Sequence, residues 1–465
     1  MNTFGESKIN KTNTKMNRRE FVRNAGLTTA AIATIPDQTL FAAQADGKIK
    51  VVMIGVGLRG QNHLSLILRR DDVELVAICD VDDKMLQMSK AIVSKSGKPM
   101  PRIFTGDENA WKKMLELKNI KAVIIATPWE LHKPMILGAL DAGIKYIATE
   151  VILGINLQDH WDVVHATEKA DAHVMMLENV CYRRDVLAAL NMVRQGLFGE
   201  MLHLQGGYQH DLREVKFNDG VNPYGHGVEF GEKAFSEARW RTNHSVYRNG
   251  DLYPTHGIGP VAQCININRG NRFLKLNSFA TKSRGLHNYI VDKGGAAHPN
   301  AKVNFRLGDI VTTTIDCANG ETIILQHDTN LPRPYSLGFR FQGTKGLWMD
   351  INKSIYVEGV SKPHTWDNAK EWLDKYDHPL WKKYGNDAQG AGHGGMDFFV
   401  IHAFIEAAKR NEATPLDIYD AAAWSAITPL SEQSIELGNE TVEFPDFTGG
   451  KWMSRKPIFA LNDDY

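Results

Sequence analysis

Three clusters of polar and aromatic residues contain the side chains best suited to chemistry on a small ligand. They are Tyr208-Gln209-His210-Asp211, Arg239-Trp240-Arg241-Thr242-Asn243-His244 and Tyr253-Pro254-Thr255-His256. Tyrosine and histidine can act as general acid and general base, and arginine can position a substrate and stabilise a developing oxyanion. Taken singly, each tyrosine or histidine is more often a structural hydrogen-bonding residue. The three clusters together indicate a site for a polar, neutral ligand.

A glycine-rich turn follows the first apolar run of the chain. Val51–Ile54 leads into the pattern Gly55-x-Gly57-x-x-Gly60. In a dinucleotide-binding turn the first glycine lets the chain turn off the strand, the second lets the backbone approach a pyrophosphate, and the third lets the next helix pack closely. That helix would direct its N-terminus at the phosphates. The alternative is a glycine-rich turn that binds no nucleotide.

A carboxylate at the end of the second apolar run favours the nucleotide. The run Val73–Cys79 ends in Asp80, 20 residues after Gly60, where a ribose-binding carboxylate belongs. Asp82 and Asp83 add negative charge that would repel a 2′-phosphate. The sequence therefore predicts NAD rather than NADP as cofactor.

Alternating apolar runs and helical stretches surround these residues. Further strands are expected at 122–127, 146–149 and 173–177, with helices at 84–94, 110–117, 134–142 and 158–172. This alternation predicts an α/β Rossmann domain with a parallel sheet, whose strand ends hold the ligand. Trp129 and His132 follow one such end and are candidates to line the nicotinamide side; ordinary loop packing is the alternative.

The second half of the chain has a different pattern. Glu178–Asp185 is expected to open a long helix to Gln195. The stretch from Met201 onward alternates and leads to the polar and aromatic cluster that begins at Gly206, and strand-rich segments lie at 273–281, 302–328 and 337–342. They predict an α+β domain with a mostly antiparallel sheet. We expect a dinucleotide-binding domain over 46–178 and a substrate-binding domain over 179–465, and a homo-oligomer formed through the C-terminal sheet.

The overall composition excludes several classes of partner. The 465 residues contain 54 Lys plus Arg and 54 Asp plus Glu, without a long basic run, so nothing favours nucleic acid or an anionic membrane. The four cysteines are widely spaced and form no C-x-x-C motif, which gives no case for a metal site and little for disulfides.

The N-terminus resembles a twin-arginine export signal. Arg18-Arg19 precedes a weakly apolar stretch from Ala25 to Ile35, and an A-x-A-like site ends at Ala45. The stretch is too short for a permanent membrane span. We expect a signal over residues 1–45, with Met1 or Met16 as the start, and a periplasmic or secreted protein; an amphipathic or disordered tail is the alternative.

Further motifs resemble a known superfamily. The glycine pattern, Asp80, A-T-P-W-E-L-H at 126–132 and T-E-V-I-L-G at 149–154 are similar to the glucose–fructose oxidoreductase/inositol dehydrogenase (Gfo/Idh/MocA) superfamily. Most members carry Glu-Lys-Pro where this chain has Glu150-Val151-Ile152, and that lysine usually assists sugar oxidation. Its absence disfavours a simple dehydrogenase.

Longer strings resemble one narrower group, glycoside hydrolase family 109, the NAD-dependent bacterial α-N-acetylgalactosaminidases. The resemblance runs from about Lys48 to Tyr465 and includes L-E-N-V-C-Y-R-R-D, G-A-G-H-G-G-M-D and the C-terminal L-N-D-D-Y. It implies NAD contacts, beside the motif glycines, by Leu58, Arg59, Asp80, Trp129, His132, Glu150, Val151 and Asn179. It implies sugar contacts by Tyr208, Arg241, Tyr253, Pro254, Thr255, His256 and Tyr335.

The resemblance also implies an unusual route of glycoside hydrolysis. An ordinary glycosidase uses two carboxylates. Here NAD oxidises C3 of a terminal α-N-acetylgalactosamine, and a base then removes the C2 proton. The glycosidic oxygen leaves from C1, and water adds to the resulting enone. The hydride finally returns from NADH, so there is no net redox change. We expect Tyr208 and His256 to be the acid and the base, in either order, and Arg241 to position the sugar. A periplasmic NAD(P)-dependent sugar oxidoreductase and a non-catalytic sugar-binding protein are the alternatives.

Overall fold

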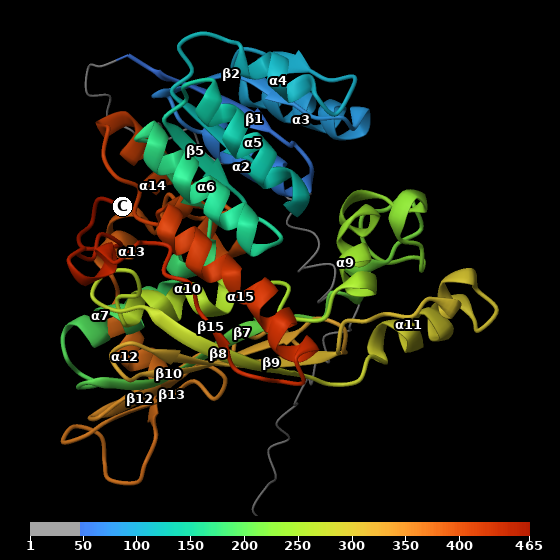
Figure 1. Cartoon of the computed structure of the whole chain (residues 1–465). Coiled ribbons are helices and arrows are strands. Elements are labelled where there is room, and N and C mark those ends of the chain that lie inside the picture. Colours follow the sequence, from blue (N-terminus) through green and yellow to red (C-terminus); the bar gives the residue numbers. More distant parts are fainter. Residues whose placement is uncertain (1–46) are drawn as a thin grey trace, which may run out of the picture. The chain divides into compact units, whose positions relative to one another are not determined.

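The computed structural model describes residues 47–465, and the first sheet in this part of the chain is parallel throughout (Figure 1). Its strand order is β3-β2-β1-β4-β5-β6. The strands are β1 (Ile49–Ile54), β2 (Val73–Cys79), β3 (Arg102–Phe104), β4 (Ala122–Ile125), β5 (Tyr146–Thr149) and β6 (His173–Met176). The order reverses between β1 and β4, and a doubly wound sheet binds its ligand at such a point. The predicted Rossmann fold is confirmed.

Helices connect these strands and cover the sheet. They are α2 (Leu58–Leu68), α3 (Asp83–Ser96), α4 (Ala110–Leu115), α5 (Trp129–Asp141) and α6 (Leu157–Ala170). Helix α5 begins earlier than the predicted 134–142, and Pro134 lies inside it. A proline removes only one backbone hydrogen bond and can be tolerated near a helix start, so Pro134 did not mark the beginning of this helix.

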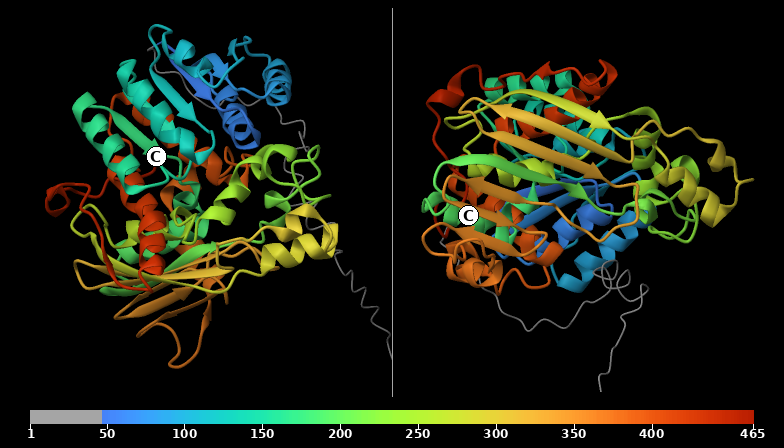
Figure 2. Two further views of the ribbon diagram at one scale, coloured as in Figure 1. Left: turned by 45° about the vertical axis from the view of Figure 1, so that its right-hand side comes forward. Right: turned by 90° about the horizontal axis from the view of Figure 1, so that it is seen from below.

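The second sheet has nine strands in the order β14-β13-β12-β11-β7-β10-β9-β8-β15. They are β7 (Met201–Gln209), β8 (Phe273–Ala280), β9 (Ile310–Cys317), β10 (Thr322–Asp328), β11 (Arg340–Gly343), β12 (Gly346–Met349), β13 (Ser354–Val357), β14 (Asp367–Asn368) and β15 (Val442–Glu443). Only β10 and β7 pair in parallel. The sheet is therefore mostly antiparallel, as predicted. Seen from below in Figure 2, its strands spread over one face of the molecule with no helix in front of them.

Helices of the C-terminal part pack on the other face of this sheet and around its edges. They are α7 (Arg184–Arg194), α8 (Arg213–Lys216), α9 (Arg241–Tyr247), α10 (Thr255–Cys264), α11 (Gly285–Gly294), α12 (Ala369–Lys375), α13 (Pro379–Tyr384), α14 (Met396–Arg410) and α15 (Ile418–Glu436). The long helix predicted from Glu178 onward is instead a 3-10 turn, η2 (Asn179–Tyr182), followed by α7. Arg183, with ψ 134°, separates the two. No helix within residues 47–465 combines the length and apolar character that crossing a membrane requires.

Two C-terminal helices join the two sheets. Helix α15 packs on β8 of the second sheet and on α6 and β6 of the first, and its Trp424 side chain is fully buried. Helix α14 packs on α2 and on η2. Both helices lie between the two sheets in Figure 1. Helices α14 and α15 therefore bring residues that are far apart in the sequence together near the end of the parallel sheet.

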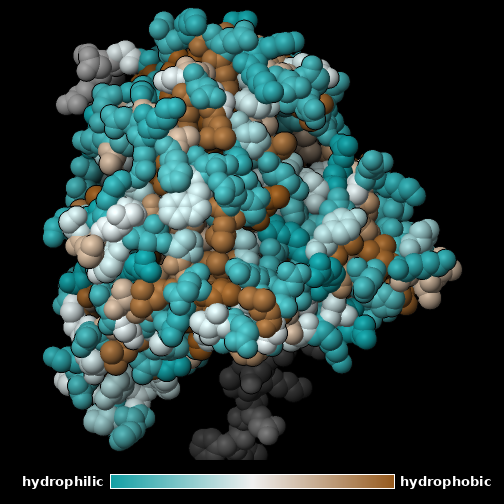
Figure 3. All heavy atoms as spheres, in the orientation of Figure 1, coloured by the Kyte–Doolittle hydropathy of each residue, from teal (hydrophilic) through white to brown (hydrophobic). Residues whose placement is uncertain are grey.

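The surface in the orientation of Figure 1 is mixed. Hydrophilic residues cover most of this face, and apolar residues interrupt them in scattered groups (Figure 3). The equal numbers of acidic and basic residues agree with a surface of this kind.

Candidate active site

The glycine-rich turn has the three properties expected of a dinucleotide-binding turn. Gly55 has φ 85°, and a Cβ on it would lie 2.4 Å from the Ala126 carbonyl oxygen. A Cβ on Gly60 would lie 2.2 Å from the Gly55 carbonyl oxygen, so α2 packs closely on the turn. A Cβ on Gly57 would meet nothing within 4 Å. Gly57 thus leaves open space at the N-terminus of α2, which Leu58 and Arg59 begin, and a helix N-terminus with open space before it is suited to a pyrophosphate.

Asp80 lies at the end of β2 beside this turn. Its carboxylate accepts hydrogen bonds from the backbone N–H of Val56 at 2.7 Å and of Asp82 at 2.9 Å. Burial raises the pKa of Asp80, and these backbone bonds oppose the rise. Each carboxylate oxygen keeps a second lone pair, so Asp80 can still accept from a ribose hydroxyl.

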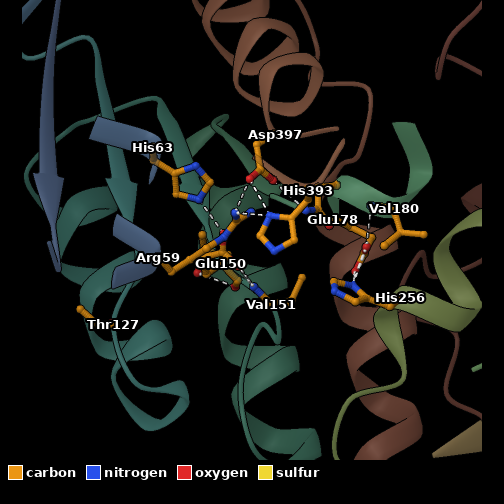
Figure 4. A network of polar contacts seen from close by, with 12 residues as sticks. Arg59, His63, Thr127, Glu150, Val151, Glu178, Val180, His256, His393 and Asp397 are labelled. Carbon is orange, nitrogen blue, oxygen red and sulfur yellow. Dashed lines mark hydrogen bonds and ion pairs between the residues drawn. The ribbon is translucent and has the colours of Figure 1, made fainter. Parts of the chain in front are cut away.

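Arg59 joins two carboxylates from distant parts of the chain. Its Nε donates to Glu150 at 2.7 Å, and its Nη1 donates to Asp397 on α14 at 2.7 Å. His63 lies 2.6 Å from the same Glu150 oxygen, and Asn179 donates to Asp397 at 2.7 Å. Figure 4 shows this network from close by. Three of the residues implied to contact NAD, Arg59, Glu150 and Asn179, therefore belong to one group.

The electrostatics of this group keep both carboxylates ionised. Burial alone would raise the pKa of Glu150, but Arg59 and His63 bring it to about 2. Burial would likewise raise the pKa of Asp397, and Arg59 and His393 hold it well below its usual range. Both groups therefore act only as hydrogen-bond acceptors at neutral pH.

Asn179 has an unsatisfied atom that a cofactor could use. Its side chain is 3 % exposed, its amide donates to Asp397, and its Oδ1 is buried without a hydrogen-bond partner in the described residues. A buried acceptor without a partner is costly, and a bound donor would remove that cost. The unpartnered Oδ1 of Asn179 and the open space at Gly57 together indicate that these residues fit a dinucleotide.

Val151, Trp129 and His132 were also predicted to contact the cofactor, and each lies in different surroundings. Val151 directly follows Glu150, and Trp129 begins α5 and packs against the ring of Tyr253, 6.0 Å between centroids. His132 is fully buried, and its two ring nitrogens lie 2.5 Å from the Ile152 carbonyl oxygen and 2.9 Å from that of Thr127. His132 thus ties together the loops after β4 and β5, and its direct contact with NAD stays a prediction.

Tyr208, Tyr253 and His256 form a compact group of rings. Their centroids lie 4.6 Å apart for Tyr208 and Tyr253, 5.1 Å for Tyr208 and His256, and 4.9 Å for Tyr253 and His256. A close approach of α10 to β7 brings these residues together. A Cβ on Gly257 of α10 would lie 2.4 Å from the backbone nitrogen of Gly207 on β7.

A buried carboxylate orients His256. Nδ1 of the ring lies 2.8 and 2.9 Å from the two oxygens of Glu178, whose side chain is 0 % exposed. Glu178 also accepts from the backbone N–H of Val180 at 3.0 Å. A carboxylate can only accept, so Nδ1 of His256 carries the proton and Nε2 remains as an acceptor. Glu178 directly precedes η2, and His256 lies in α10. Figure 4 shows the two side chains facing each other.

Arg241 and two further aromatic residues complete the sugar side. The guanidinium of Arg241 lies 4.9 Å from the ring centroid of Tyr253 and 2.6 Å from Glu237. The hydroxyl of Tyr208 lies 3.1 Å from Nδ1 of His210, and the His210 ring contacts Tyr335, 4.9 Å between centroids.

The titration of these groups follows from their surroundings. Burial and the charge of Arg241 lower the pKa of His210 to about 4, so this ring is neutral at pH 7. Burial raises the pKa of Tyr208, and Arg241 opposes but does not cancel that rise. Tyr208 therefore keeps its proton at neutral pH. The buried hydroxyl of Thr255, the residue before His256, has no hydrogen-bond partner in residues 47–465, whereas Pro254 has no side-chain polar group to offer.

Sequence reasoning missed three carboxylate and histidine residues of this site. Glu178, His393 and Asp397 were not among the predicted site residues, yet each is bonded to one that was. Glu178 is the second residue after the end of β6, and the end of a parallel strand could have indicated it. The glycine-rich stretch around His393 was a weaker signal.

Comparisons with known proteins divide the chain into two regions. Residues 49–177 match the family described as "Oxidoreductase family, NAD-binding Rossmann fold". Residues 182–454 match "Glycosyl hydrolase 109, C-terminal domain". The N-terminal region is thus an NAD-binding domain, and NAD is the cofactor of this chain.

Similar proteins extend over nearly the whole chain. A "Glycosyl hydrolase family 109 protein" of Stenotrophomonas maltophilia is 59 % identical, over 97 % of this chain and 99 % of the relative. An "Alpha-N-acetylgalactosaminidase" of Tannerella forsythia is 52 % identical, over 97 % of this chain and 100 % of the relative. Among solved structures, levoglucosan dehydrogenase with NADH and levoglucosan has a TM-score of 0.62 at 18 % identity, over 86 % of this chain and 99 % of the other. An inositol dehydrogenase homologue with NAD⁺ from Azotobacter vinelandii has a TM-score of 0.59 at 17 % identity, over 87 % of this chain and 99 % of the other. These two structures share the fold.

Proposed function

The chain belongs to glycosyl hydrolase family 109, and from this membership we propose that it hydrolyses terminal α-N-acetylgalactosamine residues of glycans. The name of the relative from Tannerella forsythia supports this substrate class. The observation that carries the proposal is the group of Tyr208, Tyr253 and His256, which contacts the NAD-binding domain through the rings of Tyr253 and Trp129. The chain also has valine at position 151, where most members of the superfamily carry the lysine that assists sugar oxidation.

The state of the carboxylates disfavours direct displacement at the sugar. Glu178 is fully buried against His256, Asp397 is fully buried against Arg59, and Glu150 is paired with Arg59. A two-carboxylate mechanism needs one acid that can be protonated and one free base or nucleophile facing the bond. These three carboxylates of the described site are instead occupied as acceptors for cationic or N–H groups.

NAD would be held by residues of both regions. The turn Gly55–Gly60 would bind the pyrophosphate, Asp80 the ribose, and Asn179 with Glu150 and Arg59 would lie toward the nicotinamide. When bound, NAD supplies an acceptor and later a donor for the hydride of C3. Oxidation of C3 to a ketone makes the C2 proton acidic, which allows elimination of the glycosidic oxygen.

The geometry supports one assignment of acid and base. His256 has an acceptor at Nε2 and a carboxylate behind Nδ1 that stabilises the protonated ring, so we assign it the removal of the C2 proton. Tyr208 keeps its proton at neutral pH and is assigned the donation to the leaving oxygen. Arg241 would fix the sugar and stabilise the developing oxyanion.

Turnover distinguishes this function from the alternatives. We expect the purified protein to release NAD on denaturation, detected by mass spectrometry, and to cleave p-nitrophenyl α-N-acetylgalactosaminide without net formation of NADH. Accumulation of NADH without cleavage would indicate a sugar oxidoreductase instead. Binding without either reaction would indicate a sugar-binding protein.

We also propose export and self-association. The predicted twin-arginine signal, and with it the periplasmic or secreted location, lies outside the described residues. Self-association through the second sheet is supported by the face of that sheet that no helix covers in Figure 2. It is also supported by Phe279 of β8, which is 51 % exposed. Light scattering coupled to size-exclusion chromatography would give the mass of the particle in solution. The mass of a monomer would contradict the proposed self-association.

A further inference from the structure

A fourth carboxylate lies on the sugar side of the site, next to Arg241. Oε2 of Glu237 accepts from Nη1 of Arg241 at 2.6 Å. The side chain of Glu237 is 29 % exposed, and that of Arg241 is 11 % exposed. No donor within residues 47–465 reaches the other oxygen, Oε1, of Glu237. Because a carboxylate accepts several hydrogen bonds, Glu237 keeps an acceptor that a ligand can use.

Buried contacts hold the turn that carries Glu237. Ser236 has φ 57°, a left-handed conformation that residues other than glycine rarely adopt. The N–H of Phe235, just before it, donates to Oδ1 of Asn218 at 3.1 Å, and the Phe235 carbonyl accepts from Nδ2 of Asn218 at 2.7 Å. Asn218 is 0 % exposed. A strained backbone that its surroundings fix in this way is typical of ligand sites.

Helix α9, which begins at Arg241, is anchored on the NAD-binding region. The ring of Trp240 contacts that of Trp129, 5.2 Å between centroids. His244 of α9 lies 3.0 Å from Glu130, and its ring contacts Trp129, 4.7 Å between centroids. The pair of Glu237 and Arg241 therefore lies where the second region of the chain meets the start of α5.

The same pair lies next to the rings of the sugar site. The guanidinium of Arg241 lies 4.9 Å from the ring centroid of Tyr253 and 5.5 Å from that of Trp129. Tyr253 in turn contacts Tyr208. Burial raises the pKa of Tyr208, the charge of Arg241 lowers it, and the charge of Glu237 raises it further. Glu237 is thus close enough to act on the Tyr208 hydroxyl.

The proposed reaction leaves two sugar hydroxyls for such an acceptor. In a terminal α-N-acetylgalactosamine, C1 carries the leaving oxygen, C2 carries the acetamido group and O3 is oxidised. O4 and O6 take no part in the chemistry. A hydroxyl needs an acceptor for its proton and a donor for its oxygen. A carboxylate paired with a guanidinium offers both, and hydrogen bonds to charged groups are the stronger ones.

We propose that Glu237 binds the sugar by accepting a hydrogen bond from O4 or O6, beside Arg241. This inference rests on the proposed function and names the substrate atoms that its site recognises. The hydroxyl donates to Oε1 of Glu237, and Arg241 donates to the oxygen of the same hydroxyl. The pair thereby selects sugars that present this hydroxyl and holds the ring while C1, C2 and C3 react.

The first test replaces Glu237 by glutamine, which keeps the shape of the side chain and removes its charge. The matched control is Asp374→Asn, because Asp374 also pairs with a basic residue four positions away, Lys370, on an exposed surface. Both variants should retain bound NAD, measured by mass spectrometry after denaturation. The control should keep the rate of the unchanged protein. Glu237→Gln should lower kcat/KM for p-nitrophenyl α-N-acetylgalactosaminide by roughly 10- to 10²-fold.

Deoxy substrates separate a contact with the sugar from a structural role. The 4-deoxy and 6-deoxy analogues of the same glycoside each lack one candidate hydroxyl. For the hydroxyl that Glu237 binds, its removal should lower kcat/KM of the unchanged protein by roughly 10- to 10²-fold and that of Glu237→Gln much less, because the partner is already lost. The analogue that shows this pattern identifies the hydroxyl as O4 or O6.

Several outcomes would overturn the proposal. They are nearly full activity of Glu237→Gln, loss of its NAD, and equal losses in the variant and the unchanged protein for both analogues. If Glu237→Gln does not fold, Glu237→Asp keeps the charge with a shorter reach and should show the same pattern, and undiminished rates of the unchanged protein on both analogues would again overturn it. Failure of the proposed function is distinct, since the unchanged protein would then not cleave the parent glycoside.

Discussion

Two glycines of the nucleotide turn make different physical demands on the chain. Gly57 has φ −60° and open space around its missing Cβ, whereas Gly60 packs against the backbone of Gly55. We expect Gly57→Ala to fold with an unchanged circular dichroism spectrum but to be purified with less NAD per chain, because the methyl group occupies the space for the pyrophosphate.

Gly60→Ala provides the comparison. Its Cβ would lie 2.2 Å from the Gly55 carbonyl oxygen, so this variant should lose both thermal stability and NAD. Full NAD content in Gly57→Ala would contradict the assignment of that space to the cofactor.

The roles of Tyr208 and His256 can be separated by the leaving group. An alkyl glycoside needs a proton on its leaving oxygen, whereas p-nitrophenolate leaves without one. Tyr208→Phe should therefore lower kcat/KM by roughly 10²-fold or more for the alkyl glycoside and much less for the p-nitrophenyl glycoside. His256→Ala should slow both substrates. The opposite pattern would exchange the two roles.

At the scale of elements, the contact of α10 with β7 decides whether these side chains meet. A Cβ on Gly257 would lie 2.4 Å from the Gly207 nitrogen, so Gly257→Ala must push the helix away from the strand. We expect a loss of about 1–3 kcal/mol in the free energy of unfolding. Activity should fall more than NAD content, because the rings move and the turn at Gly55–Gly60 does not. Urea unfolding and kcat measurements would check this, and a fully active variant would rule it out.

The same elements show what could be predicted from sequence. The glycine turn, Asp80 and the ends of the parallel strands were predicted because apolar runs and turn residues act over a few positions. The starts of α5 and α7 were not predicted correctly. Local sequence around Pro134 and Glu178 did not determine where each helix begins, because contacts with distant parts of the chain also contribute.

The missed residues of the site have a common physical cause. Arg59 bonds to Asp397 across 338 positions of sequence, and His256 bonds to Glu178 across 78. Such pairs follow from the packing of α14 on α2 and of α10 on η2, which no local pattern encodes. The types of the predicted residues indicated a polar site, but only the fold supplies the carboxylates that orient them.

At the scale of the whole molecule, export remains a prediction of the first 45 residues. Twin-arginine transport would move the protein after it has folded around its cofactor. Replacing Arg18 and Arg19 by lysine should keep the precursor in the cytoplasm, as measured by fractionation and immunoblotting. Unchanged export of the double variant would remove the twin-arginine interpretation.

Transient oxidation of the sugar distinguishes the proposed mechanism from that of an ordinary glycosidase. A base that removes the C2 proton of a ketone allows that carbon to exchange with solvent, whereas the hydride returns to C3 from the cofactor. Displacement by carboxylates leaves both positions untouched. The most direct measurement is therefore hydrolysis of an α-N-acetylgalactosaminide in D₂O, followed by NMR of the released sugar. Transient oxidation predicts deuterium at C2 and protium at C3, whereas protium at C2 after complete hydrolysis would exclude removal of the C2 proton.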